Sequence, residues 1–217
     1  MFKRYLLTLI AVPLLLAGML FGLAPLVLLR PRLETPLFEQ SACLWGSAMV
    51  LLLIVAGNRL LKMIWRFRAT AAPVPLEQLR QRLLAVNQLA CPVKATAKGN
   101  RIIVTWRRAE TPWCELLSRL DRPRLYELRC RFEVDTRTVY LIDRIRPVEF
   151  VLCPDQVKTG FARPCLPFLR SRLDHLMHID QYASLEAYQY DFLPREIKSP
   201  ILGTILACGW DVRFSLF

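Results

Sequence analysis

The chain has few of the residues, and none of the short motifs, from which common catalytic and cofactor sites are built. It contains eight glycines and two histidines. No glycine-rich loop of the GxGxxG or GxxxxGK[ST] type occurs, nor a GxSxG nucleophile turn or an HExxH zinc motif. The sequence therefore argues against phosphate-cradling loops and against the common hydrolase and zinc-protease sites. We expect a protein that is not an enzyme, with no catalytic residues, no cofactor and no bound metal.

The two histidines stand close together in the stretch Asp174–His178, "DHLMH". If the stretch is helical, His175 and His178 lie one turn apart, a spacing that could present two imidazoles to a metal. A third ligand is not identifiable from the sequence. We therefore interpret both histidines as solvated or helix-capping residues.

Closely spaced cysteines are missing as well. The chain has seven cysteines, an odd count, and no two of them are closer than twelve residues. This spacing indicates neither a zinc CxxC knuckle nor a compact disulfide framework. Six of the seven follow residue 70, and so many unpaired thiols are typical of a reducing cytosol, where they serve as small buried hydrophobes.

Long uncharged stretches, by contrast, are prominent at the N-terminus. Tyr5–Leu29 has twenty-five residues without a charge and Ser41–Asn58 has eighteen, in a chain that is 54% hydrophobic. At about 1.5 Å per helical residue, the first stretch and the second stretch extended to Leu61 can each span the hydrocarbon core of a bilayer. A cleaved signal peptide is the alternative for the first stretch, but the run is longer than a signal core and Pro25 follows the small residues of the would-be cleavage site. We favour two transmembrane helices, at about residues 5–29 and 41–64.

The distribution of basic residues near these helices predicts their orientation. Lys3 and Arg4 precede the first helix, and Arg30 and Arg32 between the helices are offset by two glutamates. More basic residues follow the second helix, and with aromatic residues they suggest a membrane interface at Arg59, Lys62, Trp65, Arg66 and Arg68, with Phe67 in the aromatic belt. We therefore expect a multi-pass protein of the bacterial inner membrane with both termini in the cytoplasm.

Small residues recur in both apolar stretches at a spacing that allows close helix packing. Gly18 and Gly22 form a GxxxG pair, and Ala42 and Gly46 form a second small-xxx-small pair. A chance scatter of small residues explains the pattern about as well. Pro13 and Pro25 need neighbouring groups to satisfy the disturbed backbone, which favours an assembled protein.

The remaining residues form one domain of ordinary size. We place a linker at 69–75 and a cytoplasmic domain at 76–217, after a transmembrane hairpin at 1–68. Helical spacing predicts a helix that begins after Pro75, and a turn at Lys98–Asn100 joins two short strands, of which the second is Arg101–Arg107. Thr111 and Pro112 begin a short helix.

Strict alternation of apolar and charged residues in Tyr126–Asp135, "YELRCRFEVD", predicts a strand with one face in the core, and the chain then returns as a long antiparallel hairpin. A helix is expected at Pro167–Ile179. A second helix is expected to begin at Ser199 and Pro200 and to end at Gly209, before a final strand. Hairpins with helices between them indicate an α+β fold.

The order of "RIIVTWR", the charged hairpin and the ending "YQYDFLPREIKSPILGTILACGWDVRFSLF" resembles the layout of uncharacterised membrane-anchored bacterial proteins. Those proteins end in an acidic-apolar strand, a short helix, Gly-Trp and a strand. The resemblance covers about residues 95–217. It implies an α+β fold for the C-terminal domain and no activity.

Two charge features remain. Asp143 interrupts the apolar run "VYLID" beside Arg144, and we interpret it as a strand-edge residue in preference to a buried carboxylate. The domain has a basic excess that is spread along the sequence, and anionic lipid headgroups explain this excess more simply than nucleic acid. Nucleic-acid binding stays possible but is not favoured.

We therefore expect an accessory or scaffold subunit of a membrane protein complex that acts through its cytoplasmic domain, with anionic lipid, other subunits or itself as partners. One alternative is a ligand-sensing membrane effector whose hairpins oligomerise into a pore. A membrane-tethered nucleic-acid binder is the other.

Overall fold

A computed structural model describes residues 2–32, 35–69, 71–120, 124–165, 176–184 and 190–216. The chain divides into two compact units, Met1–Trp65 and Arg66–Phe217.

The first unit is a pair of long helices. Helix α1 spans Phe2–Leu29, a short 3-10 helix η1 covers Arg30–Arg32, and α2 spans Thr35–Ile64. Helix α2 begins six residues before the expected position, because Pro36 fits the first turn, where its missing N–H is not needed. Both helices have the length and composition of membrane spans.

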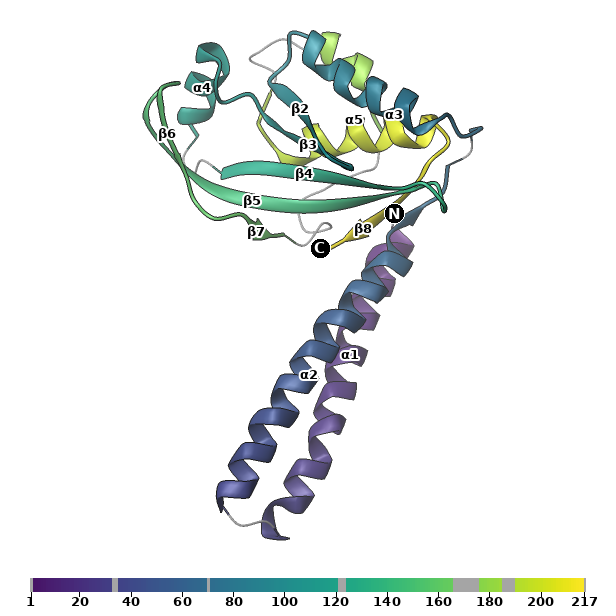
Figure 1. Cartoon of the computed structure of the whole chain (residues 1–217), viewed down its shortest axis with the longest axis vertical. Helices are drawn as coiled ribbons and strands as arrows, with labels where there is room; N and C mark the ends of the chain where they lie inside the picture. The colour runs from purple at the N-terminus through teal and green to yellow at the C-terminus, as the bar shows by residue number, and fades with distance from the viewer. Residues whose placement is uncertain are drawn as a thin grey trace. The chain divides into compact units, whose positions relative to one another are not determined.

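The two helices run side by side (Figure 1). On each helix the less exposed positions recur every three or four residues, as in left-handed helix pairs. On α2 they include Phe38, Ala42, Gly46, Met49 and Leu53. The other faces leave large apolar side chains exposed, among them Leu9, Leu20, Phe21 and Leu44, each at 70% or more.

The second unit is a mixed sheet with helices, which confirms the α+β class. The strand order is β1-β8-β5-β4-β3-β2, with β6 and β7 also paired to β5. The strands are β1 (Arg66–Phe67), β2 (Val93–Lys98), β3 (Arg101–Trp106), β4 (Arg124–Glu133), β5 (Thr138–Leu152), β6 (Gln156–Thr159), β7 (Arg163–Pro164) and β8 (Asp211–Ser215).

The pairings confirm both expected hairpins, β2–β3 and β4–β5. The final strand is also confirmed, but β8 lies parallel to β5 between β5 and β1. A parallel neighbour requires a crossover connection, usually through a helix, and α5 (Pro194–Ala207) immediately precedes β8.

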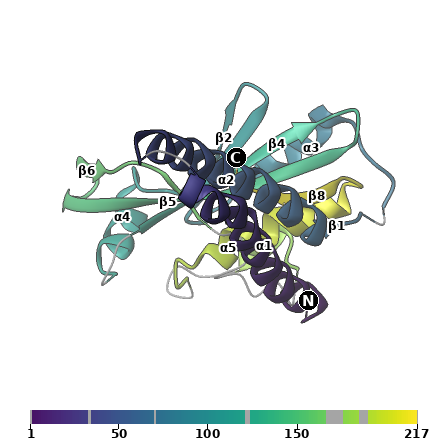
Figure 2. The same ribbon diagram turned by 90° about the horizontal axis from the view of Figure 1, so that it is seen from below.

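Helices cover one face of this sheet. Helix α3 (Leu76–Leu84) and α5 lie together over it (Figure 1), and the 3-10 helices η2 (Ala85–Gln88) and η3 (Ile179–Ser184) pack beside them. Helix α4 (Thr111–Ser118) and β6 lie at one end of the unit and α3 towards the other (Figure 2). The core contains Leu128, Cys130 and Phe132 of β4, as the alternation predicted.

The start of α5 differs from the expectation that Ser199 caps it and Pro200 opens it. The helix begins at Pro194, and the Glu196 carboxylate accepts hydrogen bonds from the backbone N–H groups of Asp191 and Leu193 at 3.1 and 3.2 Å. Pro200 therefore lies inside the helix and cannot donate to the carbonyl of Glu196. The Tyr182 hydroxyl donates to that carbonyl instead.

Two further details follow from the backbone. The end of α5 at Gly209 is confirmed, with a φ of +76°. A Cβ there would lie 2.4 Å from backbone atoms of Ala72 and Pro73, so glycine is also needed for space. The helix expected at Pro167–Ile179 lies largely outside the described residues; of its described part, residues 176–178 are not helical and Ile179 begins the 3-10 helix η3.

Candidate functional site: the open face of the sheet

The face of the sheet opposite α3 and α5, here called the open face, is defined by the strand register. Side chains alternate between the two faces of a strand, so the partners of Glu127, for example, share its face. These are Thr105 on β3 and Arg144 on β5. The same reasoning assigns every open-face residue of the paired strands.

Basic side chains make up most of the charged residues of the open face, although several of its other residues on β4, β5 and β8, among them Leu125, Thr138, Ile142 and Ser215, are buried. The register places nine cationic side chains on it, against three carboxylates, Glu127, Glu133 and Asp211. The cationic residues are Arg66, Lys94, Lys98, Arg101, Arg129, Arg131, Arg144, Arg146 and Arg213. The basic residues are spread along the sequence, as described above, but the strand register brings nine of them onto one face.

Six open-face residues form one continuous row across the sheet, here called the basic row. Each pairs directly with the next, and only the fourth is uncharged. The row runs Lys98, Arg101, Arg131, Tyr140, Arg213, Arg66, from β2 to β1. Like charges directly opposite each other destabilise a sheet, so this row costs folding free energy in the absence of a counter-charge.

The three carboxylates are already engaged. Burial acts to raise the pKa of Glu127, but hydrogen bonds from Arg129 and Arg146, the latter at 2.9 Å, bring this pKa below its ordinary value. A hydrogen bond from Thr136 lowers the pKa of Glu133. Hydrogen bonds from Arg66 and Ala69 outweigh burial and lower the pKa of Asp211.

The β2–β3 end of the basic row is the accessible end. Lys98 and Arg101 are exposed, as is Lys94 nearby. Within the described part of the chain, none of these three side chains forms an ion pair. Arg131 lies over the ring of Tyr140, at 5.0 Å from Cζ to the ring centroid. The row therefore ends in cations that are free to meet an anionic partner.

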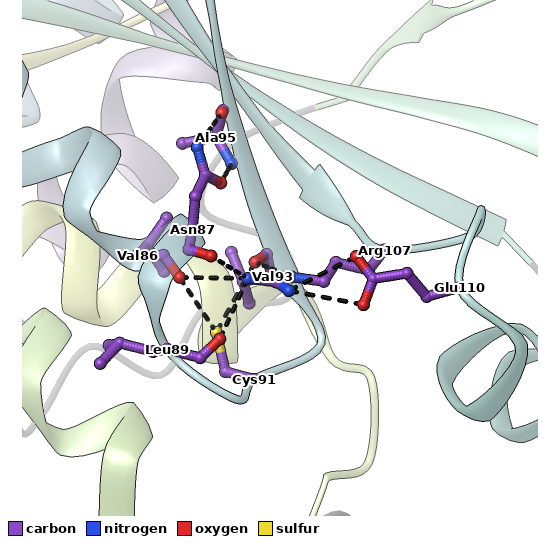
Figure 3. Close-up of polar contacts among 8 residues, drawn as sticks. All are labelled: Val86, Asn87, Leu89, Cys91, Val93, Ala95, Arg107 and Glu110. Atoms are coloured by element: carbon purple, nitrogen blue, oxygen red, sulfur yellow. Dashed lines mark hydrogen bonds and ion pairs between the residues drawn. The ribbon is translucent and has the colours of Figure 1, made fainter.

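Arg107, which follows β3, differs from the exposed cations of the basic row because its guanidinium is bonded within the protein. Figure 3 shows its guanidinium between the end of η2 and β2. It donates to the carbonyls of Val86, Asn87, Leu89 and Val93 at 2.9–3.3 Å, and it pairs with Glu110 at 3.4 Å. A cation is favourable at the carbonyl end of a helix, and a guanidinium used in this way is not available to a ligand.

A buried ion pair lies on the other face of the sheet. Asp143 of β5 is 3% exposed and Lys198 of α5 is 0% exposed, with 2.6 Å between Oδ2 and Nζ. The Lys198 ammonium also lies 3.9 Å from the centroid of the Phe214 ring. The interpretation of Asp143 as a strand-edge residue is therefore wrong. Its signal was present, because Val139, Leu141 and Asp143 alternate onto one face, whereas no sequence pattern indicated Lys198.

The predicted membrane-interface residues fall on both sides of the unit boundary. Arg59 and Lys62 lie in α2, Trp65 follows it, Arg66 belongs to β1 and Arg68 follows β1. The Trp65 indole donates to the Thr8 hydroxyl at 3.1 Å and its ring meets that of Tyr5. The aromatic-belt interpretation of Phe67 is wrong, because this side chain is 5% exposed and lies in the sheet core, with its ring 5.3 Å from that of Phe214.

The predicted packing residues differ in their surroundings. A Cβ on Gly22 would lie 2.5 Å from Met49 Cε, so this glycine lies at a close contact between α1 and α2. At Gly18 and Gly46 a Cβ would meet no atom within 4 Å, and Ala42 is half-buried. Gly18 lines an apolar hollow of about 300 Å³ between the two helices.

The structure describes only one of the two histidines that could form a metal site. His178 is exposed beside a small cleft, while Asp174 and His175 lie outside the described residues. The described part of the chain holds no group of three or more His, Cys, Asp or Glu side chains suited to a metal.

Comparison of the chain with protein-family models, curated proteins and solved structures finds no match. The assignment of function therefore depends on the residues and geometry described above.

Proposed function

We propose that the chain is a non-enzymatic, membrane-anchored scaffold protein, an accessory subunit of a membrane protein complex. Its two long helices would cross the bacterial inner membrane, with both termini in the cytoplasm. The sheet domain would then act in the cytoplasm as a binding module.

The observation that carries the proposal is the exposed apolar surface of α1 and α2. Their membrane-span windows contain no buried residue, so the helices are not the core of a soluble domain, and so large an apolar surface on a folded unit marks a membrane or protein contact. A folded sheet domain follows directly, since β1 begins two residues after α2 ends. An anchor and a binding domain in one chain are what a membrane scaffold requires.

Two alternatives have their own supporting observations. The hollow beside Gly18 leaves room for a side chain of a second copy, which favours an oligomer and hence the pore-forming effector. The basic open face could also bind nucleic-acid phosphates. However, the basic row contains one aromatic ring, Tyr140, and binding of single strands usually combines charge with several stacking aromatics.

Anchorage and orientation are tested with reporter fusions. A reporter that is active only in the cytoplasm should be active after Phe217 and inactive between Arg32 and Thr35. Alkaline carbonate should leave the chain in the membrane fraction. The opposite reporter pattern, or release by carbonate, would refute the anchorage.

The scaffold role is tested by affinity purification in mild detergent followed by mass spectrometry. We expect other membrane-complex subunits to be enriched over a parallel purification from cells that express the untagged chain. Recovery of the tagged chain alone, or of nucleic acid as the main companion, would contradict the scaffold role.

A further inference from the structure

We propose that the open face of the sheet binds the anionic headgroups of phospholipids and so holds the sheet domain on the surface of the membrane. This inference rests on the proposed membrane anchorage. It goes further by naming the binding surface and the chemistry of its ligand.

The first argument is the arrangement of charge. In the basic row, Lys98 pairs with Arg101 and Arg101 with Arg131, so three cations stand on adjacent strands at a spacing of about 4.8 Å. These pairs repel each other unless an anion lies over them. The carboxylates of the face do not remove the excess, because nine cations stand against three.

The second argument is the shape and extent of the surface. The exposed cations of the open face stand together at its β2–β3 end, where Lys94, Lys98 and Arg101 are exposed, whereas Tyr140 in the middle of the row is buried. An exposed basic edge of this kind can meet several phosphate headgroups at once. Each basic residue near an anionic membrane surface strengthens binding by about 1 kcal/mol, a factor of about five.

The third argument is the covalent connection between the sheet domain and the helices. The row ends at Arg66, which directly follows Trp65, the last residue of the helical unit. The row and the proposed anchor belong to one chain, so the anchor keeps the sheet domain within reach of the membrane and raises the effective concentration of lipid headgroups. A tethered surface of this kind needs little intrinsic affinity to be occupied by lipid, whereas a free partner would have to displace that lipid.

The test uses the full chain in lipid nanodiscs and measures how fast individual lysines are acylated by a water-soluble ester, with mass spectrometry as the readout. Lys94 and Lys98 report on the open face. Lys158 of β6 is the internal control, because it is exposed and pairs with Glu149, which alternates onto the opposite face.

In phosphatidylglycerol-containing discs we expect acylation of Lys94 and Lys98 to fall at least about five-fold relative to phosphatidylcholine discs. Acylation of Lys158 should stay unchanged. High salt should abolish the protection, because it screens exposed charges.

A double variant tests whether Lys98 and Arg101 contribute to lipid binding. Lys98→Gln with Arg101→Gln removes two charges and should weaken docking by about thirty-fold, so that Lys94 loses its protection. The matched control, Lys158→Gln with Arg163→Gln, removes the same net charge elsewhere and should leave Lys94 protected.

The outcomes separate the two proposals. If the chain does not enter nanodiscs, the anchorage itself fails. If it enters but Lys94 and Lys98 react equally in both lipids, the lipid-binding inference fails and the anchorage stands. Protection by a short nucleic-acid duplex in phosphatidylcholine discs, without protection by anionic lipid, would overturn the inference in favour of nucleic acid.

Discussion

Replacing the buried pair Asp143–Lys198 tests whether this polar contact stabilises the sheet domain or costs it stability. The variants are Asp143→Val, Lys198→Met and the double variant. Both charges are fully enclosed, with a side-chain exposure of 3% and 0%. The desolvation of two such charges can exceed their mutual attraction.

The single variants should be strongly destabilised. Asp143→Val leaves the Lys198 ammonium buried without its carboxylate, a loss that typically costs about 3–5 kcal/mol. Lys198 can escape the charge by losing its proton. From an ordinary pKa of 10.5 this costs at most about 5 kcal/mol at neutral pH, at about 1.36 kcal/mol per pH unit. Lys198→Met leaves the Asp143 carboxylate buried in the same way.

The double variant should be as stable as the parent or more stable, by as much as about 1–4 kcal/mol. Burial is the largest influence on both groups: it raises the pKa of Asp143 and lowers that of Lys198, and the partner's charge offsets only part of this. The surroundings therefore disfavour the charged form of both groups.

The pH dependence follows from these directions. With a raised pKa, Asp143 contributes stability that is full below its ordinary pKa of 3.8 and is lost as the pH rises through its folded pKa. With a lowered pKa, Lys198 contributes stability that is full above 10.5 and is lost as the pH falls through its folded pKa. The advantage of the double variant should thus be greatest between the two folded pKa values and should shrink outside them.

The assay is urea denaturation of the detergent-solubilised chain, followed by fluorescence of the buried Trp106 and Trp210. The control removes the exposed ion pair Asp191–Arg195 by Asp191→Asn and Arg195→Gln, and should change the stability by less than about 1 kcal/mol. Single variants as stable as the parent, or a double variant whose loss equals the sum of the single losses, would refute the reasoning.

Three further outcomes are expected. Tyr182→Phe should lower the free energy of unfolding by about 1–3 kcal/mol in the same urea assay, because the Glu196 carbonyl, which Pro200 cannot bond, then has no donor. Adding Pro200→Ala should recover most of this loss. A Tyr182→Phe variant as stable as the parent would contradict this reasoning. Gly22→Leu should lower the melting temperature of the helix pair in detergent, whereas Gly18→Leu should not, since only the first meets a side chain; equal effects would show that the contact is unimportant. Cys130 should resist alkylation until the domain unfolds, because burial raises the pKa of its thiol, and rapid labelling of the native chain would place this strand face in solvent.

The sequence could predict those parts of the candidate site that depend on neighbouring residues, but not those that depend on contacts between distant segments. The alternation in β4 correctly placed Cys130 and Phe132 in the core, because a strand has period two wherever it lies. The same period of two along β5 places Asp143 on the inward face, although its charge favours an exposed position. Lys198 carried no such signal, because its burial depends on which strand α5 crosses.

The sequence by itself determined the two long apolar helices, the two hairpins, the end of α5 at Gly209 and the α+β class, since periodicity, turn residues and helix ends act over a few neighbouring residues. It did not determine that β8 joins β5 in parallel, or that Arg66 and Arg213 stand opposite each other. Only the tertiary structure gathered the basic row, because strand register is fixed when distant segments bury their apolar faces together, and the charged side chains on the other face must follow.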